Sequence, residues 1–131
     1  MTSVVPLKKE SVTRFLNVDL DLRAEAGLEE LLGYLASSVL VLNRTEMEAS
    51  LELNQDFSSL EETVAGFIAL IRSLPPQAMS LWERCELRRM NIGIQAGTQP
   101  HQALFVLSKD AVASLADVRA EVMFTVYAPL G

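Results

Sequence analysis

The residues Leu16-Asn17-Val18-Asp19-Leu20-Asp21-Leu22-Arg23 alternate between apolar and polar side chains. Successive side chains of a β-strand point to opposite faces of its sheet, so this stretch predicts a strand with one buried and one solvated face. The same alternation recurs in residues 47–54, 89–95 and 122–126. Residues 39–42 and 104–107 are apolar throughout, which predicts two shorter strands that are covered on both faces.

Helical spacing of apolar residues appears between these stretches. It predicts helices over residues 28–35, 60–74 and 76–85, and one that begins after Ser108. Ser58 and Glu61 have the spacing of a capping box, and Pro75-Pro76 ends the second helix.

The resulting order, β-α-β-β-α-(α)-β-β-α-β, predicts an α+β fold: a mostly antiparallel sheet with helices on one face. Residues 14–95 have the element order of a ferredoxin-like split βαβ unit, to which a final β-α-β is appended. We expect residues 1–13 to be a loosely ordered lead-in and residues 14–131 to form a single domain.

Composition excludes several classes of partner. The chain has 131 residues and a formal net charge of −6, whereas nucleic-acid and anionic-membrane surfaces require clustered Lys and Arg. No uncharged apolar stretch reaches the roughly 20 residues of a membrane span, and Lys8, Lys9 and Glu10 interrupt any signal-like region. We therefore expect a soluble, acidic, cytoplasmic protein that binds neither nucleic acid nor membrane.

Several local strings are distinctive as a set. They are Val18-Asp19-Leu20-Asp21-Leu22, Ser50-Leu51-Glu52-Leu53-Asn54, Leu70-Ile71-Arg72-Ser73-Leu74-Pro75-Pro76, Leu81-Trp82, Asn91-Ile92-Gly93-Ile94-Gln95-Ala96-Gly97, Pro100-His101 and Thr125-Val126-Tyr127-Ala128-Pro129. Together they resemble a family of small uncharacterised bacterial proteins, a domain of unknown function. The resemblance covers most of the chain after residue 14 and implies a stand-alone bacterial α+β domain. It implies no activity, cofactor or catalytic residue.

The residue types that usually carry catalysis are sparse. His101 is the only histidine and Cys85 the only cysteine, so a zinc site of several Cys and His ligands is excluded. His101 follows Pro100 at a turn without a nucleophile motif, which favours a surface histidine. Arg84 and Arg88 near Cys85 favour a reactive thiolate, but its place on an apolar helix face favours packing. We expect no catalytic residue, cofactor or metal ligand.

The solvated side of the predicted sheet is the candidate ligand or interaction face. Asp19 and Asp21 point to the same side of one strand, about 7 Å apart, and Glu48 and Glu52 lie on the polar side of another. Paired carboxylates can hydrolyse substrates or bind hard cations, but any sheet with a solvated face shows this pattern. If their strands are neighbours, the face comprises Asn17, Asp19, Asp21, Arg89, Asn91, Gln95, Thr125 and Tyr127.

A second polar feature is the basic cluster of Arg84, Arg88 and Arg89. Arginines can bind a phosphate or carboxylate, or they can pair with Glu83, Glu86 and the strand acids.

Three functions remain compatible with these observations. The first is a small bacterial protein-interaction module, of accessory or immunity type, without catalytic activity. The second is a protein that binds a small molecule or divalent cation on the polar sheet face, and the third is a carboxylate-dependent hydrolase. We expect another protein as the partner, and we also expect a homodimer, because one apolar strand can be covered by a second subunit.

Overall fold

The computed structural model describes residues 12–99 and 101–129. This part of the chain forms five strands and four helices, in the order β1 (Arg14–Arg23), α1 (Leu28–Leu35), β2 (Val39–Arg44), β3 (Glu48–Leu53), α2 (Leu60–Arg72), α3 (Pro76–Glu83), β4 (Leu87–Gln95), α4 (Lys109–Asp117) and β5 (Glu121–Tyr127). The predicted α+β class is confirmed.

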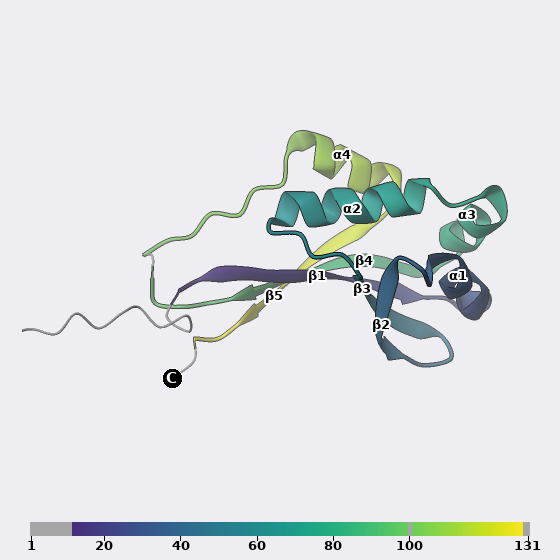
Figure 1. Cartoon of the computed structure of the whole chain (residues 1–131), viewed down its shortest axis with the longest axis horizontal. Helices are drawn as coiled ribbons and strands as arrows, with labels where there is room; N and C mark the ends of the chain where they lie inside the picture. Colours follow the sequence, from purple (N-terminus) through teal and green to yellow (C-terminus); the bar gives the residue numbers. More distant parts are fainter. Residues whose placement is uncertain (1–11, 100, 130–131) are drawn as a thin grey trace, which may run out of the picture.

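The five strands form one sheet in the order β2-β3-β1-β4-β5. β1 pairs antiparallel with both β3 and β4, and β2 pairs antiparallel with β3. β5 is the exception, because it runs parallel to β4. The first four strands therefore have the predicted ferredoxin-like arrangement, and the appended strand extends the sheet beyond β4 (Figure 1).

A single hydrophobic core lies between one face of the sheet and the helices. Alternation in β1 buries Val18, Leu20 and Leu22, as expected, and β3 and β4 contribute their own alternate residues. All four helices contribute buried side chains to this core (Figure 1). Because the helices cover one face, the opposite face of the sheet, called the open face below, remains available to solvent.

The segment Leu104–Leu107 forms no strand, which corrects the expectation of a covered strand there. Phe105 and Leu107 pack against the core, while Leu104 and Val106 are 80% and 73% exposed. The position beside β4 is occupied by β5, and a parallel pair needs a connection that crosses over the sheet. The segment is the extended first part of that crossover, which continues into α4 (Figure 1).

Residues 39–42 form the predicted strand, as part of β2, but the expectation that it is covered on both faces is wrong. Only Val39 is buried, whereas Leu40, Val41 and Leu42 are about half exposed. β2 is the edge of the sheet, and an edge strand has a neighbour on one side only. An uninterrupted apolar stretch therefore did not indicate a covered strand here.

Helix α2 begins one residue later than the capping box predicts. Its N-cap is Ser59, whose Oγ accepts a hydrogen bond from the backbone N–H of Glu62 at 3.1 Å. The side chain of Glu61 instead accepts hydrogen bonds from the backbone and hydroxyl of Ser108, the N-cap of α4. These hydrogen bonds lower the pKa of Glu61 and join the starts of α2 and α4.

The end of the predicted lead-in is tied to the domain. Val12 forms a β-bridge with Gln99, and the backbone N–H of Thr13 donates to the Gln99 carbonyl at 2.8 Å. The rest of the lead-in, residues 1–11, and Pro100 of the predicted turn lie outside the described residues.

We predict that Trp82→Phe destabilises the fold by about 1–3 kcal/mol. Trp82 is fully buried, and its indole N–H donates to the carbonyl of Val118 at 3.0 Å, which links α3 to the end of α4. The substitution removes this donor and leaves the buried carbonyl without it. Urea denaturation measures the change. Tyr34→Phe, at an exposed position, is the control, and equal stability of the two variants would contradict the role of Trp82.

Candidate functional site

The open face carries polar side chains from four neighbouring strands. Cross-strand register places Asp19 of β1 opposite Asn91 of β4, and Asp21 between Ser50 of β3 and Arg89 of β4. Between β4 and the outer strand β5, the hydroxyl of Thr125 donates a hydrogen bond to Asn91 Oδ1 at 2.8 Å. Six of the eight residues predicted for this face therefore lie together on it: Asn17, Asp19, Asp21, Arg89, Asn91 and Thr125.

Three acids in the middle of this face form the carboxylate cluster: Asp19, Asp21 and Glu52. The side-chain amide of Asn17 donates to Asp19 Oδ1 at 3.0 Å and to Glu52 Oε2 at 3.1 Å, so it bridges β1 and β3. Ser50 Oγ donates to Asp21 Oδ1 at 2.8 Å. These partners are neutral, so they orient the carboxylates without compensating their charge.

The electrostatics of the cluster are most evident at Asp19. Its pKa is raised from 3.8 to about 6, first because partial burial disfavours the ionised form, and then because Asp21 and Glu52 repel a further negative charge. Between pH 3.8 and about pH 6, Asp19 keeps its proton in the folded protein but has released it in the unfolded chain. Ionisation of Asp19 therefore lowers the free energy of unfolding as the pH rises through about 6.

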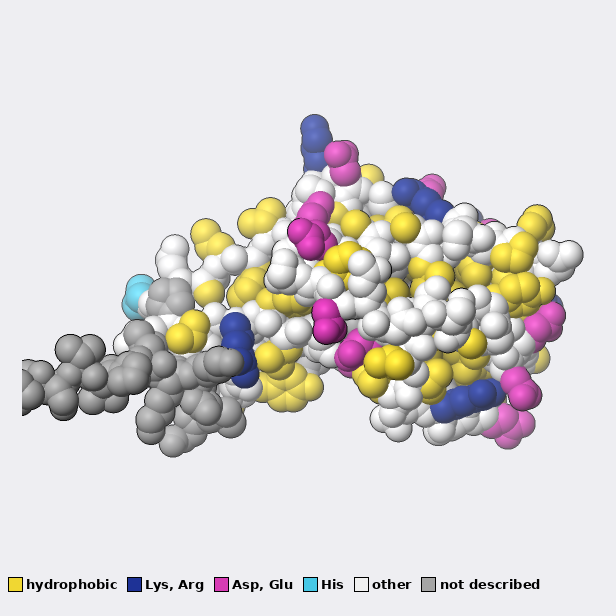
Figure 2. Space-filling model, viewed as in Figure 1, with side chains coloured by type: hydrophobic (Ala, Val, Ile, Leu, Met, Phe, Trp, Pro, Cys, Tyr) yellow, Lys and Arg dark blue, Asp and Glu magenta, His cyan; other side chains and the backbone are white. Residues whose placement is uncertain are grey.

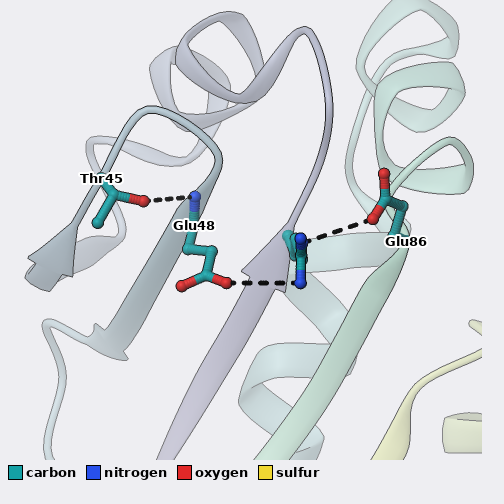
Figure 3. Close-up of polar contacts among 4 residues, drawn as sticks. Thr45, Glu48 and Glu86 are labelled. Carbon is teal, nitrogen blue, oxygen red and sulfur yellow. Dashed lines mark hydrogen bonds and ion pairs between the residues drawn. The ribbon is translucent and has the colours of Figure 1, made fainter.

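Two arginines on this face, Arg23 and Arg89, pair with other acids. Arg23, at the end of β1, lies between Glu48 at 3.8 Å and Glu86 at 3.5 Å (Figure 3). Arg89 Nε lies 3.8 Å from Glu121, and this buried nitrogen has no hydrogen-bond partner among the described residues. Among the described salt bridges, none involves Asp19, Asp21 or Glu52. The cluster therefore has no described ion-pair partner, although Arg89 lies opposite Asp21 on β4.

Local backbone geometry positions Asn17. The pairing of β1 with β4 shifts register between Phe15 and Asn17, as at a β-bulge, and this turns Phe15 toward the core. Across from Asn17 lies Gly93, where an added Cβ would come within 2.9 Å of Asn17 Oδ1. The absence of a side chain at Gly93 therefore leaves room for the side chain of Asn17.

The other two predicted face residues have different surroundings. Gln95 is buried, and its amide donates to the carbonyls of Ala96 and Ala128 at 3.0 and 2.9 Å, so it holds the end of β5. Tyr127 is exposed at the outer edge of the sheet. Conversely, Glu52 and Ser50 join the site although they were not among the predicted set. The split βαβ order was the signal for them, because it places β3 beside β1.

The thiol of Cys85 and the side chains of the two neighbouring arginines make contacts within the fold. Cys85 is buried, and burial raises the pKa of its thiol despite the nearby positive charge of Arg88. Arg88 Nη1 donates to the carbonyls of Trp82, Glu83 and Cys85, and its Nε donates to the carbonyl of Arg119. Arg84 Nε donates to the Ser80 carbonyl. Arg88 therefore binds the end of α3. The lone histidine, His101, is exposed in the crossover after β4.

The hollows near the carboxylate cluster are small. One of about 50 Å³ has a lining that includes Asn17, Glu52, Phe57 and Thr63 of α2. Another, of about 220 Å³, lies between β2 and β3 beside Glu48 and Ser50. Pockets that bury a metabolite measure roughly 300–1,000 Å³, so the first hollow is several-fold too small for one and the second is below this range. Among the described residues, no three His, Cys, Asp or Glu side chains are placed to hold a metal ion.

Among residues 12–99 and 101–129, no helix is long and apolar enough to cross a membrane. Comparisons with protein-family models, curated proteins and solved structures found no match.

We predict that Asp19→Asn stabilises the free protein by about 1–2 kcal/mol above pH 6, a value reduced for the partial exposure of the side chain. Asparagine can still accept the hydrogen bond from Asn17, but it carries no charge to repel Asp21 and Glu52. Thermal unfolding from about pH 4 to pH 8 measures the effect, which should vanish at the acidic end.

Glu46→Gln, in the exposed turn between β2 and β3, is the control for loss of a carboxylate elsewhere. An Asp19→Asn variant that follows the wild-type pH dependence throughout would show that Asp19 has an ordinary pKa.

Proposed function

We propose that the domain is a protein-interaction module without catalytic activity, which binds a Lys- or Arg-containing segment of a protein partner on the open face. The observation that carries the proposal is the uncompensated carboxylate cluster, in which Asp19 has a pKa of about 6 beside Asp21 and Glu52. A guanidinium or ammonium group placed over Asp19 relieves this repulsion, so the partner supplies the charge that the domain lacks.

The surrounding residues support a protein partner over the alternatives. Asn91, Thr125 and Ser50 surround the acids with groups that can both donate and accept hydrogen bonds, as in a polar protein interface. The hollow of about 50 Å³ beside Asn17 and Glu52 is too small to enclose a metabolite. The chain's net charge of −6 adds long-range attraction for a basic partner.

The pH dependence of binding follows from the same geometry. Below about pH 6, Asp19 holds a proton and presents less negative charge to the partner. Binding of a cationic group favours the ionised carboxylate, so the affinity should rise as the pH increases through 6 and the bound state should have a lower Asp19 pKa.

We predict that a tetralysine peptide binds the wild-type protein at low ionic strength and that Asp19→Asn with Asp21→Asn weakens binding about tenfold, equivalent to 1.4 kcal/mol. Isothermal titration calorimetry measures the affinity. NMR shifts should localise the peptide to β1, β3 and β4, with the largest changes at Asn17, Asn91 and Ser50.

The matched control is Glu29→Gln with Glu30→Gln, which removes the same charge from the exposed side of α1. It should change the affinity less than twofold if binding depends on position rather than on net charge. Equal weakening by both double variants would refute the proposed face. Competition by Mg²⁺ or Ca²⁺ at micromolar concentrations would instead favour the cation-binding alternative, and turnover abolished by Asp19→Asn would favour the hydrolase.

A further inference from the structure

The outer strand β5 leaves an apolar surface uncovered. Register places Val122, Phe124 and Val126 beside Met90, Ile92 and Ile94, on the side of the sheet that the helices cover. The β4 residues are buried, whereas Val122, Phe124 and Val126 are 36%, 54% and 60% exposed. These three residues are called the β5 edge surface below. Hydrophobic side chains are also exposed over the crossover between β4 and α4 (Figure 2), where Leu104 and Val106 lie.

The backbone of β5 is ready to pair with another strand. The carbonyl of Tyr127 accepts a hydrogen bond from the backbone N–H of Ala96 at 2.8 Å, so the backbone groups of Tyr127 point toward β4. The direction of these groups alternates along a strand. The N–H and C=O groups of Val122, Phe124 and Val126 therefore point away from β4, where no described strand lies beside them.

The two edges of the sheet differ in how they oppose such pairing. β2 has a register irregularity between Val41 and Asn43 and ends in Asn43-Arg44, and both bulges and terminal charges disfavour edge-to-edge contact. β5 spans seven residues in regular register with β4. Its sequence, Glu-Val-Met-Phe-Thr-Val-Tyr, contains one charge and neither Pro nor Lys. β5 is therefore the unprotected edge.

We infer that β5 pairs antiparallel with β5 of a second copy of this chain, with the two Phe124 residues opposite each other. In this register Val122 of each copy lies opposite Val126 of the other, so every outward-pointing backbone group of the three residues meets a partner. The apolar side chains of the two β5 edge surfaces also meet on one face. Two five-stranded sheets then join into one continuous sheet.

The charge pattern of the strand fits this occupant. Glu121 lies opposite Tyr127 of the second copy, and Met123 lies opposite Thr125, so no like charges meet across the pair. A basic partner strand would gain little here, since β5 offers one carboxylate and that carboxylate already lies near Arg89. A second copy of β5 brings no like charges together. It also places apolar side chains opposite apolar side chains, because the apolar pattern of β5 is symmetric about Phe124.

The experiment measures mass in solution by sedimentation equilibrium over a wide range of protein concentration. The wild type should reach twice the 14.4 kDa chain mass, and Phe124→Lys should remain at the single-chain mass. Val41→Lys, at a similarly exposed apolar position on the opposite edge, should still form the dimer. Circular dichroism confirms that each variant is folded.

A charge exchange tests the register. Val122→Lys alone should weaken the dimer at least tenfold, because it buries an unpaired charge at the contact. Adding Val126→Glu to the same chain should restore the dimer, because the introduced ammonium and carboxylate meet across the interface twice. Positions 122 and 126 are about 13 Å apart along one strand, so they cannot pair within a chain.

Hydrogen exchange gives an independent result. The amides of Val122, Phe124 and Val126 should be protected at high protein concentration and exchange faster on dilution. A wild type that is monomeric throughout, or a dimer that Val41→Lys breaks and Phe124→Lys does not, would overturn the inference. Failure of the double variant to restore association would overturn the register. Peptide binding to the open face is measured separately, so each proposal can fail without the other.

Discussion

The pairing of β1 with strands on both of its edges is the constraint on which the rest of the structure depends. β3 and β4 bind its two edges, and the core takes up Val18, Leu20 and Leu22 on one face. Because the side-chain period of a strand is two, the residues between them must point to the other face. Asp19 and Asp21 are therefore held at the centre of the open face, beside Glu52 of the neighbouring strand. The partial burial of Asp19 and its repulsion by Asp21 and Glu52, which together raise its pKa, are direct consequences of this pairing.

Strand alternation and helical spacing were sufficient to predict most of the fold, because each reports which side of an element is buried. They were insufficient where burial depends on distant parts of the chain. Residues 39–42 and 104–107 have the same apolar composition as covered strands, yet one forms an edge strand and the other a crossover. Their exposure depends on which positions in the sheet other strands occupy, and local sequence does not contain that information.

The candidate site shows the same division. Asn17, Asp19 and Asp21 were predictable from a single strand, and Asn91 and Thr125 from the assumption that their strands are neighbours. Glu52 was not included, although the predicted split βαβ order places β3 beside β1 and so brings Glu52 to Asn17. Gln95 was included because it alternates correctly, but its amide is engaged by the carbonyls at the end of β5. A polar side chain on the open face can therefore contact a ligand or partner only if nearby backbone groups do not already bind it.

The two surfaces proposed for interaction are chemically distinct and lie on different sides of the sheet. The open face is polar and negatively charged, whereas the β5 edge surface is apolar. The central claim is that the carboxylate cluster lacks a compensating charge until a basic partner supplies one. The most direct test is an NMR titration of the Asp19 carboxyl carbon in the free protein and in the presence of tetralysine. A pKa near 6 in the free protein that falls with the peptide bound is the predicted result. A free-protein pKa near 3.8, unchanged by the peptide, would contradict the claim.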